Sequence, residues 1–246
     1  MPINFAGNIR GGGGLIKFIT RIEPSMGGLL HWVSADVGVT KDMSNLVSSW
    51  ADRSGNGTDW GVGVGNVTYV PNAQNGLPVL RTSTATNYMT QSAFLSGTDP
   101  AEVFVILRSN KTAGEVNYAW GGFGAESYLL NHYPYGYEIY ESFGLPNGER
   151  TPGYTVLGSE ATNYGIYNVT AVAGTNNYVL RLNGSVIGTW SPSTLFWSST
   201  FYLFAGVFDQ SYQFVGDIGE VLIYDHALTN DERTKTQNYL ATKWGL

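Results

Sequence analysis

The chain has 246 residues, of which 43% are hydrophobic and 14% aromatic, so it can bury a sizeable core as one all-β domain. Charged residues make up only 13%, and the net charge of −6 disfavours nucleic-acid binding through a broad basic surface. Cysteine is absent, which excludes disulfides and thiolate metal sites, and no stretch approaches the roughly 20 apolar residues of a membrane span.

Residues 1–29 differ in composition from the rest of the chain. They include four consecutive glycines and carry a net charge of +2, so the total of −6 leaves −8 for residues 30–246. Glycine loses much entropy on ordering, so we expect an extended arm. We expect the arm to dock on a partner, the alternative being that it packs on its own body. The docking residues would be its apolar and basic side chains, namely Arg10, Leu15, Ile16, Lys17, Phe18, Ile19, Arg21 and Ile22.

From residue 30 onward the sequence is typical of strands and turns. Asn183-Gly184 predicts a tight hairpin, because this pair readily adopts the positive φ angles of such a turn, and Asn75-Gly76 and Asn147-Gly148 predict similar turns. Apolar or alternating runs predict strands at residues 103–108, 137–141, 164–173, 177–182, 185–190, 201–207 and 213–224. Many strands at this spacing favour a sandwich.

The end of the chain predicts a short helix over residues 230–243. Thr229 and Glu232 form a capping box, and Gly245 can end the helix. Three residues then fall on one helical face at intervals of four, namely Thr236, Leu240 and Trp244. We expect this face to close over the sandwich.

Both ends of residues 30–246 resemble the concanavalin A-like, laminin G-like jelly-roll superfamily. The matching segments are LHW at 30–32, WADRSGNG at 50–57, NGLPVLR at 75–81, and GDIGEVLIYDHAL at 216–228 followed by the capped helix. The resemblance implies a two-sheet antiparallel jelly-roll sandwich with a C-terminal helix, preceded by the arm. In such a fold we expect Trp32 and Trp50 between the sheets, and Glu220 bonded to a turn or to Arg81.

Glycosidases need two carboxylates facing the scissile bond. The members of this superfamily that are glycosidases place them in a Glu-x-Asp-x-x-Glu pattern, which the sequence lacks. Glu138 and Glu141 are three residues apart, as are Asp217 and Glu220, so each pair is expected on opposite sides of a strand. The sequence therefore predicts a protein that is not an enzyme and needs no cofactor.

Two further segments are candidate binding sites. Asp52, Asn56 and Asp59 offer oxygens in a loop loosely like a calcium site, although an Asx-type turn explains them equally well. Tyr133 and Tyr135 lie in a tyrosine-rich segment that could hold a glycan or another subunit, or pack inward as part of a strand. Trp120 is a further candidate for glycan contact.

The superfamily includes lectins, glycan-binding modules, some glycosidases and many phage structural proteins, so the resemblance speaks for the fold more than for the activity. We expect a virion structural protein, a phage capsid decoration or cement protein that forms a homotrimer. Its arm would anchor it to the major capsid protein or another virion protein, and residues 30–246 would project outward. The alternative is an extracellular carbohydrate-binding module, or a tail or receptor-binding component. Neither membrane nor nucleic acid is an expected partner.

Overall fold

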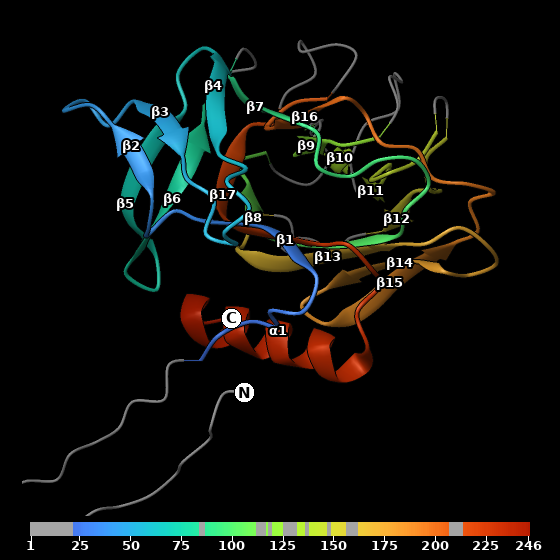
Figure 1. The fold of residues 1–246 in the computed structure, drawn as a ribbon. Coiled ribbons are helices and arrows are strands. Elements are labelled where there is room, and N and C mark those ends of the chain that lie inside the picture. The colour runs from blue at the N-terminus through green and yellow to red at the C-terminus, as the bar shows by residue number, and fades with distance from the viewer. Residues whose placement is uncertain are drawn as a thin grey trace, which may run out of the picture.

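The computed structural model describes residues 22–83, 87–111, 117, 120–124, 132–135 (backbone), 138–146, 149–155, 162–206 and 214–246. They form an almost entirely β architecture in layers, as expected. A small sheet covers one face of a large sheet, and α1 (Asn230–Trp244) lies along the opposite face (Figure 1). Within the described residues no helix has the length and apolar character to cross a membrane.

The large sheet is antiparallel, with β17 near its middle. Its order is β15 (Ser185–Trp190), β14 (Tyr178–Leu182), β13 (Gly165–Ala171), β8 (Ala101–Ser109), β17 (Gly216–Tyr224), β6 (Leu77–Thr82) and β5 (Thr68–Gln74), with β1 (Leu29–Ser34) also paired to β17. Asn183 and Gly184, with φ angles of 50° and 82°, make the predicted hairpin between β14 and β15. Asn75 and Gly76 likewise join β5 to β6, whereas Asn147-Gly148 lies outside the described residues.

The small sheet and a side sheet complete the β structure. The small sheet runs in the order β2 (Val39–Lys41), β3 (Val47–Trp50), β4 (Trp60–Val64), β7 (Tyr88–Ser92), β16 (Thr200–Leu203) and β9 (Gly121–Gly122). The side sheet consists of β10 (His132–Tyr135), β11 (Glu138–Tyr140) and β12 (Tyr154–Thr155). Its pairing is irregular between His132 and Tyr135.

Two hydrophobic cores lie on either side of the large sheet. Along β8, Val103, Val105 and Leu107 belong to the core between the sheets, whereas Phe104 and Ile106 belong to the core beneath the helix. Side chains alternate across a strand, so a strand covered on both faces reads as a continuous apolar run. Trp50 fills the space between the sheets as expected.

The expectation for Trp32 was wrong. Trp32 packs in the core beneath α1, and its indole Nε1 donates to Glu220 at 2.7 Å. The same buried carboxylate accepts from Tyr239 Oη and from Trp244 Nε1, each at 2.7 Å. Glu220 therefore joins β1 to the helix, and the predicted bond to Arg81 is absent.

Arg81 instead pairs with Asp217. Its Nε and Nη2 reach the two carboxylate oxygens at 2.5 and 2.8 Å, and Arg108 reaches the same buried carboxylate at 2.7 Å. Asp217 and Glu220 also share the outer face of β17, contrary to the expectation from their spacing. The pairing of β17 with β8 shifts between Ile218 and Glu220, and such an irregularity reverses the side-chain alternation.

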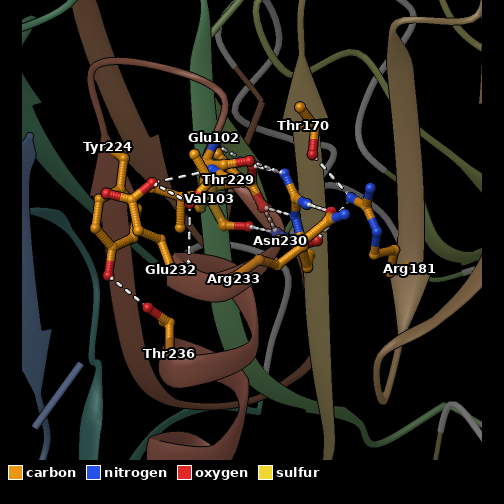
Figure 2. Close-up of polar contacts among 12 residues, drawn as sticks. Glu102, Val103, Thr170, Arg181, Tyr224, Thr229, Asn230, Glu232, Arg233 and Thr236 are labelled. Carbon is orange, nitrogen blue, oxygen red and sulfur yellow. Dashed lines mark hydrogen bonds and ion pairs between the residues drawn. The ribbon is translucent and has the colours of Figure 1, made fainter. Parts of the chain in front are cut away.

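Glu102 is the third carboxylate buried on this outer face, and it fastens the start of α1 (Figure 2). Arg233 donates from Nε and Nη2 to its two oxygens at 2.7 and 2.8 Å, while the Leu228 amide and Asn168 Nδ2 supply further hydrogen bonds at 2.9 and 3.0 Å. A buried charge is tolerated when it is paired and hydrogen-bonded. The predicted capping box of Thr229 and Glu232 is present next to this contact.

Residues 22–28 precede β1 and run along the helix. The Ser25 amide donates to Thr236 Oγ1 at 3.2 Å, and Tyr224 Oη donates to the Ser25 carbonyl oxygen at 3.0 Å. Gly28 has a φ of 65°, and a side chain there would collide with Asp225 and His226. The last residues assigned to the arm therefore pack as part of the body.

Candidate functional site

Most of the residues expected in the arm contact lie outside the described part of the chain. These residues are Arg10, Leu15, Ile16, Lys17, Phe18, Ile19 and Arg21. Ile22 is the first described residue, and 49% of its side chain is exposed. Docking of the arm on a partner thus stays a prediction.

The aromatic candidates differ in their surroundings. Tyr133 and Tyr135 belong to β10, where Tyr135 pairs with Glu138, and the structure describes only their backbone. Trp120 is fully buried in the core between the sheets, so its proposed contact with a glycan was wrong. Its ring lies 5.5 Å from that of Phe123, an environment that stabilises the fold.

The loop that follows β3 bonds to itself. Asp52 accepts from the amides of Trp32 and Ser54 at 2.9 Å each, and Asp59 accepts from the Asp52 amide at 2.8 Å. Burial raises the pKa of Asp52, but these hydrogen bonds outweigh it and hold the pKa at about 2. Asn56 donates to the Leu30 carbonyl oxygen at 2.8 Å. These hydrogen bonds fit the Asx-type interpretation, and the described residues contain no group of three or more His, Asp or Glu placed to hold a metal ion.

Two buried titratable groups lie inside the sandwich. His31 Nε2 accepts from Trp60 Nε1 at 2.7 Å, and burial lowers the pKa of His31 to about 4 against the opposing charge of Asp52. Burial raises the pKa of Glu141 to about 7, although Tyr167 Oη donates to this carboxylate at 2.7 Å. Neither group has exposed surface, so a change in its protonation alters the free energy of unfolding.

Six residues of the small sheet lie on its outer face, two of them aromatic, and we call this set the platform: Ser49, Gly61, Gly63, Tyr88, Thr90 and Tyr202. Met89 and Phe201 point into the core between the sheets. Since side chains alternate along a strand, Tyr88, Thr90 and Tyr202 project from the opposite face. The two tyrosine rings lie with centroids 5.6 Å apart at an interplanar angle of 59°.

Glycines form the floor of the platform. A side chain at Gly63 would collide with the ring of Tyr88 and with Thr90, so the ring lies directly over this glycine. Tyr202 pairs with Gly122 on one side and with Thr90 on the other. The site thus offers half-buried aromatic faces next to hydroxyl groups, a combination that suits ligands with both apolar and polar surfaces.

Sequence reasoning missed this site. Tyr88 and Tyr202 are far apart in the chain and meet only because β7 and β16 pair. A strand was predicted at 201–207, but β7 is short and polar and carries little hydrophobic alternation, and nothing local shows that the two strands pair. The available signal was the repeat Gly61-Val62-Gly63-Val64, in which apolar and side-chain-free positions alternate as in a strand.

No protein-family model matches the chain, and no curated protein sequence matches it. Solved structures do match. One is a Trypanosoma rangeli sialidase in complex with sialic acid, at a TM-score of 0.61 and 14% identity, over 88% of this chain and 33% of that chain. Another is the binding domain of Botulinum neurotoxin DC in complex with rat synaptotagmin II. It aligns at a TM-score of 0.63 and 12% identity, over 88% of this chain and 52% of that chain.

A third match is to a separate domain rather than to part of a longer chain. Domain 4 of AbnA, a GH43 extracellular arabinanase from Geobacillus stearothermophilus in complex with arabinotriose, aligns at a TM-score of 0.54 and 15% identity, over 85% of this chain and 96% of that domain. This chain spans only a third of the sialidase and about half of the toxin fragment. At these identities the matches show the fold alone, a sandwich of antiparallel β-sheets.

Proposed function

We propose that the protein is a lectin-like module that binds glycans without cleaving them, and that the platform is its binding site. The observation that carries the proposal is the pair Tyr88 and Tyr202, held 5.6 Å apart on a glycine-rich face. Structures of similar fold support it: a Trypanosoma rangeli sialidase is in complex with sialic acid, a binding domain of Botulinum neurotoxin DC with SialylT, and domain 4 of AbnA with arabinotriose.

The chemistry of the platform fits a sugar. A pyranose or furanose ring has a face of C–H groups that packs on an aromatic ring, and a rim of hydroxyls that needs hydrogen-bond partners. Tyr88 and Tyr202 supply the rings and phenolic hydroxyls, while Thr90 and Ser49 supply further hydroxyls that both donate and accept.

The fold accounts for three of the described buried carboxylates without catalysis, and Glu141, the fourth, accepts hydrogen bonds from Tyr167 Oη and from the amides of Ser142 and Phe143. On the outer face of the large sheet, Glu102 and Asp217 are bound by arginines, and Glu220 by indole and phenol donors. All three are fully buried, on the side of the large sheet away from the platform. We therefore propose binding alone, and incubation with the bound glycan should release no shorter product.

The proposal is tested by titrating the protein on an array of immobilised glycans. Tyr88→Ala and Tyr202→Ala should each weaken saturable binding by about tenfold or more, since each removes an aromatic contact. Tyr133→Ala and Tyr135→Ala serve as matched controls on the side sheet, and they should bind as the unaltered protein does. Binding lost in these two and kept in the platform variants would move the site to β10. Absence of binding to any glycan would refute the proposal.

We also propose, as the second candidate, a structural role on a virion in which the arm anchors this module to a capsid. The observation in its favour is the opposite charge of residues 1–29 and residues 30–246. Because Ser25 bonds to Thr236 and Tyr224, the variant that tests it should lack residues 2–21 and keep the packed segment. That variant should fold normally and fail to join particles, and normal incorporation would refute the anchoring role.

A further inference from the structure

One row of paired residues crosses the whole small sheet. Ser49 pairs with Thr40 on one side and with Gly61 on the other, and Gly61 pairs in turn with Thr90. Thr90 pairs with Tyr202, which pairs with Gly122. Directly paired residues share a face, so the row lies along the outer face of the small sheet. Its members bear a hydroxyl group or no side chain at all.

Gly61 is the open position in this row. A side chain built at Gly63 would strike Tyr88, whereas one built at Gly61 would meet nothing within 4 Å, and Gly61 needs no positive φ. Adjacent strands are about 4.8 Å apart, so the backbones that carry Ser49 and Thr90 are about 10 Å apart with Gly61 between them, and we call the space over Gly61 between these two side chains the gap. The gap is bordered by hydroxyls on both sides and has the tyrosine rings at one end.

The small sheet is almost free of charge. β3, β4, β7, β9 and β16 contain no Asp, Glu, Lys or Arg. The ammonium group of Lys41 in β2 already has two partners: it donates to Asn45 Oδ1 at 2.6 Å and lies 4.9 Å from the centroid of the Tyr69 ring. Residues 30–246 carry a net charge of −8, so the surrounding field repels anions.

We infer that the platform binds a neutral oligosaccharide and that one of its sugar rings sits over Gly61, between Ser49 and Thr90. This inference rests on the proposed glycan-binding function and specifies its ligand class. An acidic glycan would have to bring its carboxylate to described strands that, β2 apart, contain no Lys or Arg, on a body with a net charge of −8. A neutral sugar meets hydroxyl partners and an aromatic wall.

The test is Gly61→Val. Valine fits a strand, and a Cβ atom at Gly61 meets no atom within 4 Å, so the melting temperature should stay the same or rise. Its side chain would fill the gap, so affinity for neutral oligosaccharides should fall by about tenfold or more. Gly61→Ala, which adds a single methyl group, should give an intermediate loss. Thr189→Val is the matched control on β15, at an exposed strand position outside the platform, and it should bind normally.

The array carries each neutral oligosaccharide beside its sialylated or uronic-acid-containing counterpart, for example lactose beside sialyllactose, and also arabinotriose. Tighter binding of the acidic members, or unchanged binding by a folded Gly61→Val variant, would overturn the inference. If Tyr88→Ala and Tyr202→Ala abolish binding in the same assay, the proposed function stands and only the place or class of the sugar is wrong. If nothing on the array binds, both are wrong.

Discussion

Replacing Arg233 by methionine tests how the helix is held on the sheet. The substitution keeps an unbranched chain of similar bulk and removes the guanidinium that binds Glu102 at 2.7 and 2.8 Å. Glu102 has no exposed surface, so it would keep its charge in the interior without a bidentate partner.

The size of the effect follows from what remains around Glu102. Removing one partner of a buried ion pair costs about 3–5 kcal/mol. The Leu228 amide and Asn168 still donate to the carboxylate, and Arg233 is itself 16% exposed, so the lower end applies. We expect a loss of about 3 kcal/mol, which for a domain of this size lowers the melting temperature by about 6–12 °C.

Urea unfolding followed by circular dichroism measures this loss. Lys235→Met is the matched control, since Lys235 lies on the same helix and is exposed, and it should change stability by less than about 0.5 kcal/mol. Arg233→Lys should recover part of the loss, because an ammonium restores the charge without the two-pronged geometry. If Arg233→Met costs less than about 1 kcal/mol, the ion pair does not hold the helix and the reasoning fails.

Two further predictions concern pH and helix capping. The folded-state pKa of Glu141 is raised from 4.5 to about 7, so its contribution to stability is present below pH 4.5 and is lost as the pH rises to 7. The free energy of unfolding of Glu141→Gln, measured by urea titration, should therefore rise by about 3 kcal/mol relative to that of the unaltered protein between pH 4.5 and pH 8. A difference in free energy that does not change with pH would contradict this. Thr229→Ala should cost about 1 kcal/mol by removing the cap, while Thr234→Ala, exposed on the same helix, should stay within about 0.5 kcal/mol; equal losses would contradict the capping role.

The sequence predicted the architecture best where local signals agreed. The strand predicted at 185–190 has those bounds, the helix predicted at 230–243 extends one residue further, and the capping box and Asn-Gly hairpin are both present. In these elements turn chemistry, capping and periodicity act over a few residues, so they can be read without knowing the rest of the fold.

The contacts made across layers could not be read in the same way. Whether Trp32 faces the small sheet or the helix depends on which side of β1 is inward, and both sides are apolar. Asp217 and Glu220 share a face only because the pairing of β17 with β8 shifts between Ile218 and Glu220, where an indole ring occupies the space a side chain at Gly219 would need. Spacing rules assume a regular strand, and they fail where pairing slips by one residue.

The platform depends on the order of the strands in the sheet, which no local pattern shows. Ser49, Gly61, Thr90 and Tyr202 come from four segments spread over most of the chain, and each is unremarkable in its own context. The tyrosine-rich segment drew attention because its residues are close in sequence. Proximity in sequence pointed to a binding site on the side sheet. Strand pairing instead brings Tyr88 and Tyr202 together on the small sheet.

The layer order has a consequence for attachment. The segment at residues 22–28 and helix α1 both lie on the side of the large sheet away from the small sheet (Figure 1). A linker joined before Ile22 or after Leu246 would therefore leave from the back of the molecule, with the tyrosines facing forward. If the platform binds glycans as proposed, several copies tethered this way would engage one polysaccharide together, and avidity would strengthen weak single contacts.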